Sequence, residues 1–302
     1  MREKVNGFVG VMAVAILCMV SGLCMVWGIA PVVLAVYVAA CAVCGRYMIT
    51  CIGCAAGVAA GSMGIAGLLH AYEYMIPGPV YSGVVVTEKY LVLLGLAMCL
   101  MKIVYSRNSR SYVRVIVVMS AAVLMGNIVV YADNMLMAEA YGVVEAAIFM
   151  CASVILKPGI GLLYTYICGD ASDVERDESW NISQGIVSLM ALAAVVLWVV
   201  PGEDIYGVNP AFMLALVLIL YAVYRTGAVY GCGMAAVVGS IVSVKLNDSR
   251  WLMWMLLVTL VMLIGRALTG RRKVSASLFY VLGCVLASVA DGTVLWNGSG
   301  RE

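Results

Sequence analysis

Cysteine and histidine are the residues of this chain that first suggest metal or redox chemistry, with 11 cysteines and one histidine. Two Cys-x-x-Cys pairs follow each other closely, Cys41/Cys44 and Cys51/Cys54. A metal site would be expected to add histidine or carboxylate ligands, and the histidine, His70, falls in a connecting segment. All the cysteines except Cys168 lie inside apolar runs, where cysteine is typically a small, polarisable packing residue. We therefore expect no metal ion and no cofactor.

Other catalytic and binding patterns do not stand out in the sequence. There is no evident Ser/His/Asp, Cys/His or paired-carboxylate arrangement, so we expect the chain not to be an enzyme. Its glycine-rich stretches do not follow a predicted strand, as a dinucleotide-binding loop would. No basic patch is interleaved with aromatic residues, and a nucleic-acid partner is therefore not expected.

Glu145 is the most informative polar residue, because it lies in the apolar stretch YGVVEAAIFMCASVILKPGIG. A carboxylate that faces lipid costs several kcal/mol, so such groups normally face protein or a cavity. We predict that Glu145 faces the interior of a helix bundle and bonds to helix 226–244 or to Arg225. Its role would be a polar lock between packed helices, although a proton-binding site remains an alternative. A position in the outer interfacial zone, solvated by headgroups, is the other alternative.

Composition determines the solvent that these residues meet. The chain of 302 residues is 65% hydrophobic and 11% charged, and its mean hydropathy is +1.06. A soluble domain carries about 25% charged residues, and a soluble fold of this size has no means of hiding so much apolar surface. The apolar runs are long and continuous rather than alternating, which indicates helices in a lipid bilayer. The predicted fold is thus an all-α, polytopic membrane bundle.

Hydropathy divides the chain into about ten or eleven transmembrane helices within a single domain, 1–302. The expected spans are 8–28, 30–45, 47–70, 89–105, 112–132, 138–157, 184–200, 209–224, 226–244, 251–269 and 275–291. Lysine and arginine gather in every second connection, beginning with the N-terminus, which predicts a cytoplasmic N-terminus in a bacterial cell membrane. KLNDSR is the ambiguous connection, and the side of the C-terminus depends on the count of spans. The segment 158–183 is expected to be an acidic cytoplasmic loop.

Two glycine series are expected to mediate close helix packing. Gly53, Gly57 and Gly61 recur every four residues in one predicted span. Another predicted span carries Gly227, Gly231 and Gly239 at compatible spacings. Small residues on one helix face let backbones approach closely in lipid. A glycine-lined pore is the alternative interpretation.

The order of these features resembles the N-terminal membrane domain of the stage II sporulation protein E family. The resemblance rests on YGVVEAAIFMCASVILKPGIG, on DVERDESWNISQGIVSLMALAAVVLWVV and on FMLALVLILYAVYRTGAVYGCGMAAVVGSIVSV. It would carry over Glu145, Gly227, Gly231 and Gly239 as family positions. Members of that family continue into a metal-dependent serine phosphatase domain, whose aspartates this sequence lacks. The resemblance therefore implies a membrane anchor and assembly module without the phosphatase.

Two functions are compatible with these features. The first is a non-enzymatic module of sporulation at the asymmetric septum, which packs and oligomerises through its helices with copies of itself or with other septal membrane proteins. The second is a small-solute or ion transporter with Glu145 as its intramembrane polar site. A bundle that satisfies Glu145 internally favours the module, whereas a cavity lined by Glu145, Arg225 and nearby tyrosines favours transport.

Overall fold

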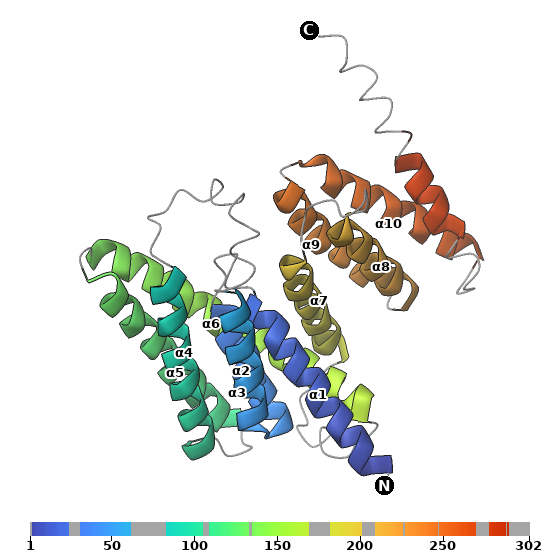
Figure 1. The fold of residues 1–302 in the computed structure, drawn as a ribbon. Helices are drawn as coiled ribbons and strands as arrows, with labels where there is room; N and C mark the ends of the chain where they lie inside the picture. Colours follow the sequence, from blue (N-terminus) through green and yellow to red (C-terminus); the bar gives the residue numbers. More distant parts are fainter. Residues whose placement is uncertain are drawn as a thin grey trace. The chain divides into compact units, whose positions relative to one another are not determined.

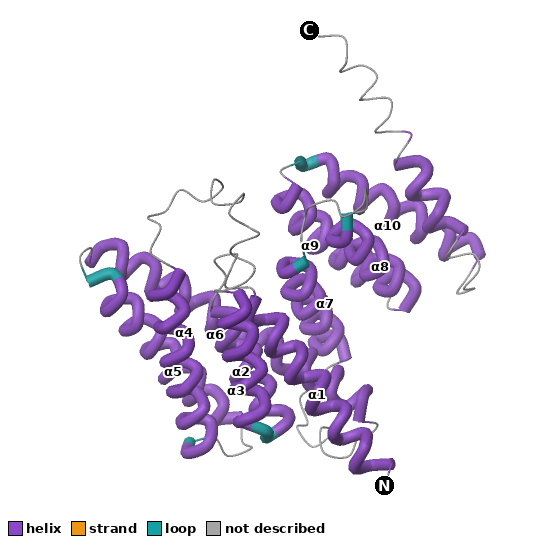
Figure 2. Tube along the Cα trace, viewed as in Figure 1, coloured by secondary structure: helices purple, strands orange, loops and turns teal. Residues whose placement is uncertain are grey.

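The computed structural model of the chain describes residues 2–23, 31–61, 83–104, 109–132, 135–168, 182–200, 209–225, 227–246, 248–269, 278–287 and 289. Within these residues the secondary structure is helical and contains no strand, as Figure 2 shows by its colours. The predicted all-α class is therefore confirmed.

The helices are α1 (Arg2–Leu23), α2 (Pro31–Cys44), α3 (Tyr47–Ala60), α4 (Gly83–Ile103), α5 (Ser109–Val130), α6 (Met135–Cys168), α7 (Ile182–Val199), α8 (Pro210–Arg225), α9 (Ala228–Leu246) and α10 (Arg250–Thr269) (Figure 1). A further short apolar helix covers Leu278–Ala287. Each apolar span predicted from the sequence overlaps one of these helices. Their positions agree with hydropathy because backbone groups in an apolar segment must bond within the segment itself.

Four helical segments in the described part of the chain are long and apolar enough to cross a membrane: Arg110–Val130, Ala138–Ile167, Ala228–Leu246 and Arg250–Thr269. Several other apolar helices are shorter than 18 residues, α2, α3 and α8 among them. Together with the composition, these segments indicate a membrane protein. The larger count of spans and the direction of the N-terminus remain predictions.

The contacts divide the chain into two compact units, Met1–Val199 and Val200–Glu302, where the sequence predicts a single domain. In the first unit α1 packs on α3, while α6 packs on α2, α5 and α7. In the second unit α9 packs between α8 and α10. Hydropathy identifies apolar helices but contains no information on which of them share a core, and for that reason this division was not predicted.

Helix α2 forms the centre of the first unit. Every residue from Pro31 to Cys41 is buried, and α2 contacts α1, α3, α4 and α6. The sequence PVVLAVYVAACAVC has no polar face, and a helix that is apolar all round is normally enclosed by other elements. Its one phenol is satisfied, because the Tyr37 hydroxyl donates to the Tyr47 carbonyl over 3.3 Å.

Helix α6 corrects the predicted boundary at Lys157. The helix continues through Pro158 to Cys168, so the first part of the expected loop 158–183 is helical. Proline lacks an N–H group and strains the helix before it, which is why the sequence suggested an end there. Next to the proline, α7 supplies an acceptor to α6: the N–H of Gly159 donates to Ser188 Oγ over 2.5 Å. The acidic remainder of that loop, 169–181, lies outside the described residues.

Candidate functional site

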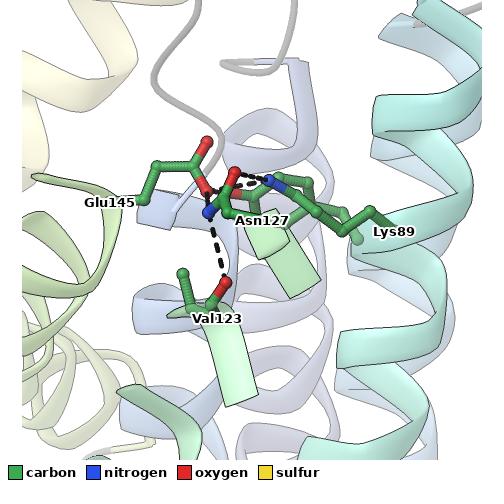
Figure 3. Close-up of polar contacts among 5 residues, drawn as sticks. Lys89, Val123, Asn127 and Glu145 are labelled. Carbon is green, nitrogen blue, oxygen red and sulfur yellow. Dashed lines mark hydrogen bonds and ion pairs between the residues drawn. The ribbon is translucent and has the colours of Figure 1, made fainter. Parts of the chain in front are cut away.

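Three helices of the first unit bring together four polar side chains, with Glu145 at the centre (Figure 3). Glu145 extends from α6, Asn127 from α5, and Lys89 and Tyr90 from α4. Glu145 Oε2 accepts a hydrogen bond from Lys89 Nζ at 2.8 Å, from Asn127 Nδ2 at 2.7 Å and from the Tyr90 hydroxyl at 3.0 Å. We call these four residues the Glu145 cluster.

The four side chains of the cluster are buried to different degrees. Asn127 and Tyr90 are fully buried, and the side chains of Lys89 and Glu145 are 4% and 19% exposed. An isolated charge at such a position carries a large desolvation cost, whereas a hydrogen-bonded pair of opposite charges offsets much of it. Lys89 and Glu145 form such a pair, and the site as a whole has no net formal charge.

Each donor in the cluster has a partner. Lys89 Nζ also donates to Asn127 Oδ1 at 3.0 Å, and it lies 4.7 Å from the centre of the Tyr90 ring. Asn127 Nδ2 donates a second bond to the Val123 carbonyl one helical turn earlier, at 3.1 Å. That bond fixes the amide so that its oxygen faces Lys89 and its nitrogen faces Glu145. The arrangement is a connected network rather than a set of separate pairs.

The helical repeat positions the cluster along α5 and α6. Residues four apart share a helix face, so Tyr131 lies one turn beyond Asn127 and Tyr141 lies one turn before Glu145. The rings of Tyr131 and Tyr141 stack with their centres 5.5 Å apart. The stacked pair therefore lies between the cluster and the connection from α5 to α6. On the other side of Glu145, Phe149 is fully buried.

Two glycines of α5 and α6 lie beside the polar side chains, at distances where an added Cβ would make ordinary van der Waals contact. A Cβ on Gly126 would lie 3.4 Å from Lys89 Cγ, and a Cβ on Gly142 would lie 3.5 Å from Asn127 Cβ. The lysine chain therefore passes beside Gly126 of α5, while its ammonium reaches Glu145 of α6. This is how a long cationic side chain places its charge at a distance from its own helix.

The cluster is suited to joining helices. All three bonds to Glu145 converge on one oxygen, and in Figure 3 its second oxygen carries no bond to the residues drawn. These donors are the partners that an ionised carboxylate requires, and a proton on Oε2 would displace at least one of them. Proton exchange at this atom would therefore disrupt the contacts between α4, α5 and α6.

The structure gives Glu145 a partner that sequence reasoning did not identify. The sequence predicts an interior position for Glu145, and its side chain is four-fifths covered in the structure. The expected partner, Arg225, has a side chain outside the described residues, and the partner observed is Lys89. A signal for it existed in the predicted topology: Lys89, Asn127 and Glu145 all fall toward the outer ends of their spans, 89–105, 112–132 and 138–157. The predicted topology therefore places these three polar residues at a similar depth in the membrane, where they can contact one another.

Two of the glycines in the first predicted series lie where α3 crosses α1. A Cβ on Gly53 would come within 2.7 Å of the Ala15 carbonyl oxygen, and one on Gly57 within 2.1 Å of the Met19 carbonyl oxygen. Gly22 of α1 faces Gly57, since its own Cβ would lie 2.6 Å from Gly57 Cα. The helices thus approach each other backbone to backbone. Gly61 is buried at the C-terminal end of α3, where its N–H group bonds to Gly57 and Val58 carbonyls.

The second glycine series has two different roles. A Cβ on Gly231 would lie 2.7 Å from Val223 Cγ2 of α8, and one on Gly239 would lie 3.0 Å from Leu252 Cδ1 of α10. Both are therefore packing positions. Gly227 differs from the prediction, because it lies in the turn between α8 and α9 with a φ of +107°. Glycine is required there for backbone conformation, since other residues rarely adopt this φ.

The cysteine pairs belong to helices α2 and α3. In the part of the chain that the structure describes, no group of three or more His, Cys, Asp or Glu side chains is arranged to hold a metal ion. Cys41 Sγ instead lies 3.1 Å from the hydroxyl of Thr50, in the contact between α2 and α3. His70 lies outside the described residues.

Comparison with known proteins gives this chain no relative. No family model, curated protein or solved structure matches it.

Proposed function

We propose that the chain is a non-enzymatic, multipass membrane module whose helices are locked together by the Glu145 cluster. The observation that carries this proposal is the convergence of Lys89, Tyr90 and Asn127 on Glu145 Oε2. A carboxylate held by three donors from two neighbouring helices is satisfied within the bundle. This is the outcome that favours an assembly module over a transporter.

The resemblance to the membrane domain of stage II sporulation protein E supplies the cellular part of the proposal. The module would act in sporulation, at the asymmetric septum of a bacterial cell, with a cytoplasmic N-terminus. Its partners would be copies of the same chain or other septal membrane proteins. The resemblance supports this role through the order of its motifs, and the Glu145 cluster supports it by giving the family glutamate a structural task.

The test is the position of a fluorescently tagged copy in a spore-forming bacterium whose own gene for this chain has been replaced. We expect uniform membrane signal during growth and concentration at the septum when asymmetric division begins. A Glu145→Gln copy should reach the membrane in lower amounts or lose the septal signal. A Glu139→Gln copy is the matched control, because Glu139 is an exposed carboxylate of the same helix.

A small-solute transporter is the competing function, and the partial exposure of Glu145 is the observation that favours it. Uniform signal at every stage of growth and division would overturn the septal role. Solute uptake that depends on Glu145 but not on Glu139 would then establish transport. Septal signal without any Glu145-dependent uptake would support the module.

A further inference from the structure

The second unit has aromatic side chains gathered at one end. Phe212 lies in the first turn of α8, and Trp251 and Trp254 lie in the first turns of α10. The ring of Phe212 lies 4.9 Å from that of Trp251 and 6.2 Å from that of Trp254, and the two tryptophan rings are 5.6 Å apart. We call these three residues the aromatic cluster. Because it joins the beginnings of α8 and α10, these helices run in the same direction.

The same end carries charged groups, of which Arg250 is exposed and Lys245 is buried. Asp248 precedes α10 and pairs with Arg250 at 2.8 Å, and the Arg250 side chain is 49% exposed. Lys245, in the last turn of α9, donates to the Val200 carbonyl. Aromatic rings thus lie directly beneath a polar rim.

The opposite end of the unit is basic. Arg266, in the last turn of α10, donates to the Val223 carbonyl near the end of α8. In the sequence, Arg225 is the last residue of α8, and Arg271, Arg272 and Lys273 follow the last residue of α10. Positive charge favours the cytoplasmic side of a membrane. This rule predicts that the aromatic end is the outer end.

Between the two ends, the surface is apolar. Large exposed apolar side chains occur along α10 at Met253, Leu256, Leu260, Ile264 and Leu268. Those of α8 include Met213 and Val217. The 20 residues of α10 span about 30 Å, the thickness of the hydrocarbon core. An apolar band of this height, bounded by aromatic residues and then by charges, matches a bilayer in cross-section.

We propose that the aromatic cluster is an interfacial anchor, which binds the headgroup–acyl boundary of the outer leaflet and places Asp248 and Ser249 outside the cell. Tryptophan has this preference because its ring is apolar and its N–H group can bond to headgroups or water. The proposal assigns a side to the connection KLNDSR, whose charges leave its side ambiguous. It rests on membrane insertion, one part of the proposed function, and not on any role in sporulation.

The first test measures how deep Trp251 and Trp254 lie in the bilayer. The full chain is reconstituted in phosphatidylcholine vesicles whose acyl chains carry bromine either near the headgroup or near the chain ends. Emission of the Trp251→Phe/Trp254→Phe variant is subtracted from that of the unsubstituted chain. The difference is the emission of Trp251 and Trp254. We expect bromine near the headgroup to quench a larger fraction of it than bromine near the chain ends. A Trp198→Phe variant, changed in the other unit, serves as the control for the substitutions.

Two results of this test overturn the anchor. Stronger quenching by bromine at the chain ends would place the rings in the hydrocarbon core. Absence of quenching by both lipids, in protein that stays with the vesicles after an alkaline wash, would show that protein covers the cluster, such as a second copy of this chain. Loss of the protein in the wash would instead overturn insertion and with it both proposals.

The second test determines the side of the membrane. Ser249 and Thr269 are exposed residues at opposite ends of α10, and each is replaced singly by cysteine. With a membrane-impermeant maleimide on intact cells, Ser249→Cys should label above the background of the unsubstituted chain. Thr269→Cys should label only after permeabilisation. The reverse pattern overturns the outer assignment. Septal position is a separate readout, so a failure of the sporulation role is distinguishable from a failure of the anchor.

Discussion

At the scale of the residue, the structure explains why an apolar chain retains Glu145. The carboxylate and the Lys89 ammonium are each unfavourable in a low-dielectric interior, and each removes much of the other's cost. Asn127 and Tyr90 complete the hydrogen bonding of the pair. Such a network adds less to stability than well-packed apolar side chains of similar volume, but it strongly penalises arrangements of α4, α5 and α6 that separate its members.

Glu145→Gln is expected to destabilise the first unit, because it leaves the Lys89 ammonium buried without a counter-charge. Removal of one partner of a buried pair costs about 3–5 kcal/mol, and the partial exposure of Glu145 lowers our expectation to about 2 kcal/mol. The measurement is the free energy of unfolding in mixed micelles with increasing denaturing detergent.

A double-mutant cycle measures the interaction energy between Lys89 and Glu145 separately from the effect of each single substitution. Lys89→Met combined with Glu145→Gln should cost clearly less than the sum of the two single changes, because no charge remains uncompensated. Glu139→Gln, on the exposed face of α6, should change stability by no more than about 0.5 kcal/mol. Wild-type stability of Glu145→Gln would rule out the lock.

At the scale of the element, close approach of backbones determines which helices pair. Helices α1 and α3 meet at Gly22, Gly53 and Gly57, and a side chain at these points would overlap the opposite backbone. In lipid there is little hydrophobic drive to bring helices together, so dispersion contacts at such crossings contribute much of the association.

Gly57→Ala should therefore destabilise the α1–α3 pair by about 1–3 kcal/mol, the usual cost of overpacking, because its Cβ would meet the Met19 carbonyl. Gly95→Ala in α4 is the matched control. A Cβ there has nothing within 4 Å, and the gain in helix propensity predicts stabilisation of up to about 1 kcal/mol. Equal effects of the two changes, measured by the same unfolding method, would contradict the close crossing.

The bond that carries α6 through Pro158 gives a second element-scale prediction. Ser188→Ala removes the acceptor of the Gly159 N–H group and should cost about 1–3 kcal/mol, the penalty for an unsatisfied buried donor. Ser240→Ala should be nearly neutral, since the exposed Ser240 hydroxyl bonds to the Ala236 carbonyl of its own helix. Amide hydrogen exchange near Gly159 should accelerate in the first variant, and unchanged exchange there would show that another group takes over as acceptor.

At the scale of the whole molecule, the contacts divide the chain into two compact units. The first contains the Glu145 cluster and the buried α2, and the second is the α8–α10 layer with its aromatic and basic ends. A change in the core of one unit is therefore expected to leave the core of the other intact.

Thiol labelling measures this independence. Cys18 and Cys54 are fully buried in the first unit and should react with a maleimide only when that unit opens. Glu145→Gln should lower the denaturant concentration at which both react. Gly239→Val, which overpacks the α9–α10 contact, should leave that concentration unchanged. A shift in Gly239→Val equal to that in Glu145→Gln would show that the two units unfold as one.

The elements that were well predicted are those set by local physics. Apolar runs require helices, because lipid offers their backbone groups no other partner, and the described helices follow those runs. The errors at Lys157 and Gly227 share a cause. At Lys157, the predicted helix end is absent, and a hydroxyl of α7 accepts a hydrogen bond from the backbone beside Pro158. At Gly227, the glycine is needed for the backbone conformation of a turn and not for packing on a helix face. Neither can be read from the neighbours of the residue in sequence.

The sequence by itself determined the solvent, the helical class and the presence of a carboxylate that needed a partner. These follow from composition and periodicity, which act residue by residue along the chain. Only the tertiary structure decided that the partner is Lys89, that Asn127 orients both charges, and that α2 is enclosed while α8–α10 form a unit of their own. The physical reason is that hydropathy assigns the same favourable energy to burial against any apolar neighbour, whereas hydrogen bonds and backbone contacts depend on particular atoms meeting at particular distances.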